Sequence, residues 1–166
     1  MVKIGNRKTD ALKYLLDFTR YTPRDMTELF RSIQGRANIG PVTSEQVRAG
    51  ADSFATNHLL HEIISESVGL LPEVVTSRLE QFFNALPASK FEKSDLMQAM
   101  EESAIADAIS ASDLGEYLFL QGAIGNYRIS RGYYQFYHRR HAVSFDKNGP
   151  WSLHVGLTYA LNLPFS

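Results

Sequence analysis

A run of basic and aromatic residues near the C-terminus is the segment best suited to binding another molecule. Residues 126–145 contain four arginines and two histidines, and no Asp or Glu. Arginine makes bidentate contacts with phosphate, and tyrosine adds a hydroxyl group or a stacking face. The candidate nucleic-acid-binding residues are Tyr127, Arg128, Arg131, Tyr137, Arg139 and Arg140. We therefore expect this run to contact the phosphate backbone of DNA.

Two other interpretations of the run stay open. Its tyrosines can pack in the core while its arginines face water, or the whole run can contact another protein. The preceding segment, residues 110–116, carries Asp113 and Glu116 and no basic residue. Helices that read DNA bases normally offer Arg, Lys, Asn or Gln. We therefore expect any DNA binding to have little sequence preference.

Catalytic and metal-binding patterns are weak in this sequence. His58 and His61 are three residues apart beside Glu62, but no third ligand is apparent. His138 and His141 are an odd number of residues apart, so a strand would place them on opposite faces. The chain has no cysteine, which excludes a thiol nucleophile and a zinc finger. We expect no enzyme activity, no cofactor and no metal.

Charge is unevenly distributed along the chain. Residues 1–36 hold eight Lys/Arg against four Asp/Glu, residues 37–125 hold four against thirteen, and residues 126–166 hold five against one. Two basic ends of +4 therefore flank a middle of −9. The ends are expected either to face an anionic partner or to pair with the acidic middle.

The size and composition predict an ordered protein of one domain, or of one domain with a small appendage. The chain has 166 residues, of which 44% are hydrophobic, so it can bury a core. No apolar run approaches the roughly 18 residues that cross a membrane. The first residues are polar and charged, unlike a signal peptide. We expect a cytoplasmic protein with no membrane partner.

Local signals divide the chain into helices and one hairpin. Residues 8–34 predict two helices, with Thr22 as the N-cap and Pro23 as the first residue of the second. Residues 37–42 are rich in turn formers, and we place a boundary there. Thr43 and Gln46 form a capping-box pattern that begins a long helix.

The rest of the chain continues this pattern. Helices are expected near residues 72–87, 94–102 and 112–121, the last ending at Gly122. Strands are expected at 124–129 and 133–145, and a short helix at 151–163. This element order is that of a winged helix-turn-helix domain. The predicted fold is mainly α with a small β-hairpin.

Two segments resemble a known family. KYLLDFTRYTPRDM at 13–26 resembles the helical lid of prokaryotic P-loop ATPases related to the AAA+, KAP and STAND groups. GAIGNY at 122–127 and HVGLTYALNL at 154–163 resemble their winged helix tail, although Gly156 stands where that family tends to have proline. The resemblance implies a lid-like helical pair at 1–36, a linker at 37–42 and a winged helix domain at 43–166.

The resemblance also makes Arg24 a candidate nucleotide sensor that acts only beside an ATPase core. The alternative for Arg24 is an ion pair with Asp25 or Glu28. The sequence has no Gly-x-x-x-x-Gly-Lys-[Ser/Thr] motif, which a P-loop needs to hold phosphates. The chain is therefore expected to be a non-catalytic, DNA-contacting or regulatory part of such an ATPase. The alternative is a module that docks an ATPase core, a partner protein or a second copy of the chain.

Overall fold

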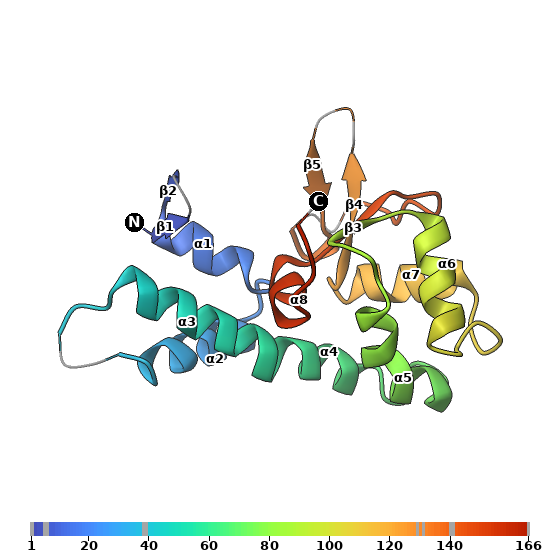
Figure 1. Cartoon of the computed structure of the whole chain (residues 1–166), viewed down its shortest axis with the longest axis horizontal. Helices are drawn as coiled ribbons and strands as arrows, with labels where there is room; N and C mark the ends of the chain where they lie inside the picture. Colours follow the sequence, from blue (N-terminus) through green and yellow to red (C-terminus); the bar gives the residue numbers. More distant parts are fainter. Residues whose placement is uncertain are drawn as a thin grey trace.

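The computed structural model describes residues 2–4, 7–37, 40–128, 130, 132–139 and 142–165. The protein is mainly helical, with one small antiparallel sheet of four strands and a separate N-terminal hairpin (Figure 1). The helices are α1 (Ala11–Asp17), α2 (Pro23–Gln34), α3 (Ser44–Phe54), α4 (Leu60–Glu66), α5 (Glu73–Asn84), α6 (Lys93–Glu102), α7 (Ala111–Leu120) and α8 (Val155–Ala160). The strands are β1 (Val2–Ile4), β2 (Arg7–Thr9), β3 (Lys90–Phe91), β4 (Ile124–Arg128), β5 (Tyr133–Gln135) and β6 (Trp151–Leu153).

Several helix ends confirm the local signals. The Thr22 hydroxyl accepts a hydrogen bond from the backbone N–H of Asp25, and Pro23 opens α2. Thr43 and Gln46 make the expected reciprocal capping box at the start of α3. A π-helical turn, Ala55–Leu59, joins α3 directly to α4, so the predicted long helix is continuous. It runs along the lower edge of the molecule in Figure 1.

The sheet differs from the predicted hairpin. Its strand order is β3-β6-β4-β5, and all three pairings are antiparallel. The strand expected at 133–145 ends at Gln135, and the chain then forms a 3-10 turn, Tyr137–Arg139. The helix expected at 151–163 begins only at Val155, because Trp151–Leu153 pairs with both β3 and β4. The hairpin is therefore one edge of a larger sheet.

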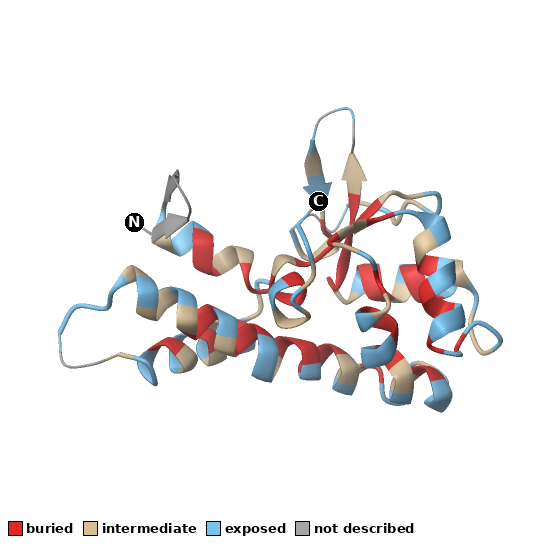
Figure 2. Cartoon of the chain, viewed as in Figure 1, coloured by how far each residue is buried: buried red, intermediate tan, exposed pale blue. Residues whose placement is uncertain are grey.

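One hydrophobic cluster connects the N-terminal helices with the sheet. Phe18 and Leu29 from the first 36 residues belong to the same cluster as Phe54, Leu118 and Trp151. Buried positions line the long helix and the centre of the sheet (Figure 2). The helices before the 37–42 segment therefore share their core with the rest of the chain.

The two parts approach each other closely at Gly50. A Cβ atom built on Gly50 would lie 2.5 Å from Ile33 Cγ1 and 2.7 Å from Ile33 Cα. The second contact is with backbone, so a side-chain rotation cannot relieve it. Only glycine lets α2 and α3 pack at this distance.

Gly50→Ala is expected to destabilise the protein by about 2–3 kcal/mol, because the added methyl group forces the two helices apart. In an isolated helix the same change would stabilise by about 1 kcal/mol. Thermal melting measures the difference. Gly35→Ala is the control, because a Cβ there meets nothing closer than 3.6 Å. A higher melting temperature for Gly50→Ala would show that α2 does not pack on α3.

Candidate functional site

The β4–β5 hairpin carries two of the predicted nucleic-acid-binding residues. It stands out from the helices in Figure 1. Tyr127 on β4 is opposite Tyr134 on β5, and their ring centroids are 5.3 Å apart. The Lys90 ammonium group lies 4.8 Å from the Tyr127 ring centroid. Tyr127, Tyr134 and Lys90 form an aromatic and basic surface on one face of the sheet, which we call the hairpin surface. Arg128 follows Tyr127 on β4, so its side chain lies on the opposite face.

Arg128 is part of a polar network on the opposite face of the hairpin. Its Nη1 donates to Asp146 Oδ2 at 2.8 Å, and its Nε donates to Gln135 Oε1 at 2.8 Å. The Arg128 side chain is 42% exposed. Asp146 immediately follows the acid-free run 126–145 and offsets part of its charge. A phosphate would have to share or displace this carboxylate.

Tyr137 and Arg139 lie in the 3-10 turn that follows β5. The Tyr137 ring packs edge-on against Phe119 of α7, with centroids 5.9 Å apart. Arg139 Nη2 donates to Asp17 Oδ1 of α1 at 2.8 Å. The structure therefore separates Tyr127 and Arg128 from Tyr137 and Arg139. The other two predicted residues, Arg131 and Arg140, lie outside the described residues.

Helix α7 presents an acidic face. Asp113, Glu116 and Leu120 are its exposed residues. The Phe145 ring covers Gly115, where an added Cβ atom would lie 2.5 Å from Phe145 Cζ. The exposed residues offer no cationic or amide side chain to a base edge.

A buried ion-pair cluster around Arg20 is the main polar feature that the sequence analysis missed. Arg20 and Asp25 are 7% and 0% exposed. The Arg20 Nε is 3.3 Å from Asp25 Oδ2, which also accepts from the Arg20 backbone N–H at 2.9 Å. The two terminal nitrogens of Arg20 donate to the two carboxylate oxygens of Glu66, at 2.5 and 3.2 Å. We call Arg20, Asp25 and Glu66 the Arg20 cluster.

The electrostatics of the cluster favour a charged Arg20. Burial lowers the pKa of Arg20, but the hydrogen bond to Glu66 and the charges of Asp25 and Glu66 outweigh burial, so the net shift is upward. Little in the sequence points to this cluster. Arg20 lies just before the turn at Tyr21, whose φ in the structure is 61°. No local pattern identifies Glu66 as its partner.

Arg24, the candidate sensor, forms an ion pair with Glu62 of α4. Arg24 is 68% exposed, whereas Glu62 is 8% exposed. The expected partners were Asp25 and Glu28, but Asp25 pairs with Arg20, and Glu28 pairs with Arg31. Arg24 therefore helps to fasten the start of α2 to α4.

Two histidine rings lie close together at the 3-10 turn: His138 belongs to the turn and is partly buried, and His154 is fully buried. His154 caps α8, since its Nδ1 accepts from the Gly156 N–H at 3.1 Å. Its Nε2 is 3.3 Å from the Thr19 carbonyl oxygen, which places the proton on Nε2. The ring of His138 lies 5.5 Å from the ring of His154 and has no hydrogen bond to any other described residue. Burial is the main cause that lowers the pKa of each histidine to about 3.

Among the described residues, no group of three or more Asp, Glu or His side chains is arranged to hold a metal ion. None of the helices in that part of the chain combines the length and the apolar character needed to cross a lipid bilayer. No protein-family model, curated protein or solved structure matches this chain.

Proposed function

We propose that this chain is a non-catalytic winged helix module that binds nucleic acid through the phosphate backbone, with little sequence preference. The hairpin surface is the observation that carries this proposal. It places the Lys90 ammonium group beside the Tyr127 and Tyr134 rings, and Arg128 adds a second cation on the opposite face of the projecting hairpin. Cationic and tyrosine side chains of this kind contact phosphates, sugars and bases.

The order of the strands supports the winged helix assignment. A winged helix domain has the order helix, strand, helix, helix, strand, wing, strand, and its third strand lies between the other two. Helices α5, α6 and α7 with strands β3, β4 and β6 follow this order, and β6 lies between β3 and β4. In this assignment the wing is the connection from β4 to β6, and β5 extends it.

The distribution of charge supports backbone contact over base reading. The helix in the position of a recognition helix, α7, exposes Asp113 and Glu116, which repel phosphates. The cationic groups lie on the sheet instead. Binding is therefore expected to use the β4–β5 hairpin, with the exposed acids of α7 away from the nucleic acid.

The resemblance to P-loop ATPases gives the proposal a context. We propose that the module serves as a DNA-contacting or regulatory part of such an ATPase. The segment that resembles the lid is held against α4 by the Arg20 cluster and by the Arg24–Glu62 pair. These contacts support a rigid arrangement of the lid-like helical pair against the proposed winged helix domain. The candidate sensor Arg24 could then reach a nucleotide only by leaving Glu62.

The four arginines of residues 126–145 are each expected to neutralise about one phosphate, so the affinity for duplex DNA should fall with salt at a log–log slope of roughly −3 to −4. Arg128→Gln should weaken binding and reduce the size of that slope by about 0.9. Asp146→Asn should strengthen binding, since it removes the carboxylate that competes for Arg128. Fluorescence anisotropy on two unrelated duplexes at several salt concentrations measures both effects.

The Arg31–Glu28 pair of α2 provides matched controls, because it is another exposed arginine–carboxylate pair. Arg31→Gln and Glu28→Gln are expected to leave the affinity unchanged. If the unmodified protein binds neither duplex at low salt, the nucleic-acid proposal is wrong.

A second candidate function is docking of a protein partner or a second copy of the chain. Val68 and Leu70, in the turn between α4 and α5, are 69% and 67% exposed. In Figure 1 the turn between α4 and α5 lies in the lower part of the view, and the β4–β5 hairpin lies at the top. If the chain self-associates through this turn, Val68→Ser with Leu70→Ser should make it monomeric in light scattering. An unchanged mass for the variant would contradict this role.

A further inference from the structure

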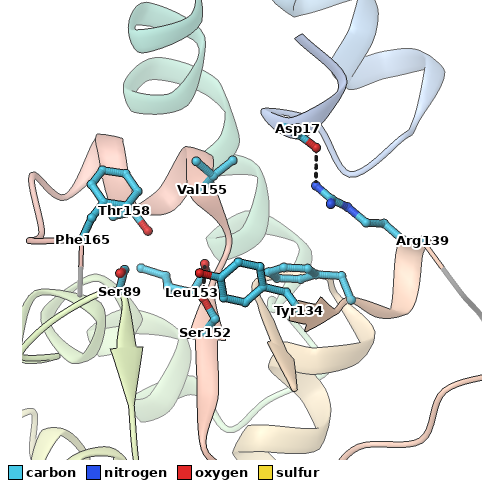
Figure 3. A pocket seen from close by; sticks show the side chains of 10 residues that line it. Asp17, Ser89, Tyr134, Arg139, Ser152, Leu153, Val155, Thr158 and Phe165 are labelled. Atoms are coloured by element: carbon cyan, nitrogen blue, oxygen red, sulfur yellow. Dashed lines mark hydrogen bonds and ion pairs between the residues drawn. The ribbon is translucent and has the colours of Figure 1, made fainter. Parts of the chain in front are cut away.

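A small cavity lies between α1, β5, β6, α8 and the C-terminal residues (Figure 3). Its volume is about 210 Å³. It is lined by Asp17, Ser89, Tyr134, Phe136, Arg139, Ser152, Leu153, Val155, Thr158 and Phe165. Pockets for drug-sized ligands measure about 300–1,000 Å³, so this cavity suits a smaller group such as one planar ring system.

One wall of the cavity is aromatic and continues from the hairpin surface. Tyr134 is 44% exposed and lines the cavity, while its ring also packs against Tyr127. Phe136 is 4% exposed, and its ring centroid lies 6.4 Å from that of Tyr134. An exposed tyrosine face beside an apolar floor can stack with a nucleic-acid base of any type.

The other side of the cavity carries a charged pair. In Figure 3 the Arg139 guanidinium group points toward Asp17 across the rim. The guanidinium carbon lies 5.5 Å from the centroids of the Phe136 and Tyr21 rings. These contacts hold the cation beside the aromatic wall. The cavity therefore offers a stacking surface and a fixed cation at neighbouring positions.

The Asp17 carboxylate occupies the position on Arg139 that a phosphate would take. The side chains of Arg139 and Asp17 are 31% and 36% exposed. Ion pairs at this exposure contribute only about 0–1 kcal/mol, so another anion can replace the carboxylate at little cost. Arginine binds phosphate oxygens through the same donor geometry that it uses for carboxylates.

Ser89, Ser152 and Thr158 add hydroxyl groups to the lining of the cavity. The hydroxyl groups of Ser152 and Thr158 donate to the backbone carbonyl oxygens of Leu153 and His154. Their oxygen atoms therefore keep lone pairs that can accept from a ligand that carries N–H groups. Nucleic-acid bases carry such groups on their Watson–Crick edges.

We propose that this cavity binds one unpaired nucleotide of a single-stranded nucleic acid, with the base against Tyr134 and the phosphate on Arg139 in place of Asp17. The inference rests on the proposed function and makes it more specific. A base inside a duplex is stacked and paired on both sides, so only a single strand can supply a base to the cavity. The hairpin surface would then hold the backbone that leads to this nucleotide.

The test uses the full chain with a fluorescein-labelled 12-nucleotide single strand and with the corresponding duplex. Tyr134→Leu is expected to weaken binding of the single strand by about 5- to 150-fold, the effect of losing one base–aromatic stack. Binding of the duplex is the comparison: it also uses the Tyr134 ring of the hairpin surface but offers no unpaired base, so it should weaken by a smaller factor than binding of the single strand. Arg139→Gln should also weaken binding of the single strand, whereas Asp17→Asn should strengthen it.

Phe30→Leu and Glu28→Gln are the matched controls, since both side chains belong to α2 and do not line the cavity. Neither control should alter binding. A thermal melt of each variant verifies that it is folded. Asp17→Asn keeps the test decisive if Tyr134→Leu proves unstable, because a gain of affinity cannot come from unfolding.

Three outcomes would overturn the inference in different ways. Equal binding of the single strand by Tyr134→Leu and the unmodified protein would reject the cavity and leave the duplex-binding proposal intact. If a free mononucleotide displaced the labelled strand at the same concentration as an unlabelled 12-nucleotide strand, the ligand would be a free nucleotide and the single-strand proposal would be rejected. Binding of neither the single strand nor the duplex would reject the proposed function itself.

Discussion

Arg20→Met is expected to lower the free energy of unfolding by about 3–5 kcal/mol, because it leaves a buried carboxylate without its cation. The carboxylate is that of Asp25, which is fully buried. Arg20 also holds both oxygens of Glu66, 46 residues later in the chain. The substitution therefore breaks the connection between α4 and the segment before α2, as well as removing a charge.

Chemical denaturation at neutral pH measures this loss, and thermal melting should show a drop of roughly 10 °C. Arg31→Met is the control, since its exposed pair with Glu28 should contribute at most about 1 kcal/mol. Adding Asp25→Asn to Arg20→Met should restore part of the stability, because the unpaired charge is then gone. Equal losses for Arg20→Met and Arg31→Met would show that the Arg20 cluster does not form.

The Arg20 cluster also bears on the uneven charge of the chain. One expectation was that the basic ends pair with the acidic middle. Arg20–Glu66 and Arg24–Glu62 are two such pairs between the first 36 residues and the middle. Part of the positive charge of residues 1–36 is therefore neutralised by carboxylates within the protein. On the sheet, Arg128 pairs with Asp146 of the same C-terminal part, so this pair does not draw on the acidic middle.

Features that depend on neighbouring residues could be predicted from the sequence. The N-cap at Thr22, the capping box at Thr43 and the glycine stop at Gly122, with a φ of 72°, all involve residues within one helical turn. Each arises from backbone groups at a helix end that need a partner or a left-handed residue. Such signals are visible without knowledge of the rest of the fold.

Features that depend on distant residues were missed. Trp151–Leu153 is only three residues long, and it becomes a strand because β3 and β4 flank it. The strand expected to reach residue 145 stops early because Phe136 turns inward and its ring packs on Gly125. Arg139 forms an ion pair with Asp17, which lies 122 residues earlier in the sequence. Pattern and spacing contain no information about such pairings.

Acidification from pH 7 to pH 5 is expected to lower the free energy of unfolding by about 4 kcal/mol through His138 and His154 together. Each histidine has a pKa of about 3 in the folded protein, and burial is the largest cause. In the unfolded chain the pKa of histidine is about 6.5. As the pH falls below 6.5, only the unfolded state takes up these protons. The stability is therefore complete above pH 6.5 and is progressively lost toward pH 3.

Arg20 and Arg139 strengthen this effect, since their positive charges also lower the pKa of both histidines. Protonation of His154 would also remove the Nδ1 lone pair that accepts from Gly156 and caps α8. The folded state therefore cannot easily accommodate either proton. At low pH the region where α8 and the 3-10 turn meet α1 is therefore expected to open, so that the histidines can take up protons.

Urea denaturation between pH 7.5 and pH 5 measures the slope of stability against pH. In His154→Asn the loss over this range should fall to about half, because one histidine remains and asparagine still caps the helix. His61→Gln, at an exposed histidine, should leave the slope unchanged. The absolute stability of His154→Asn is not the criterion, since a smaller buried side chain costs stability at every pH. The same slope in His154→Asn and in the unmodified protein would show that His154 is not held neutral by burial.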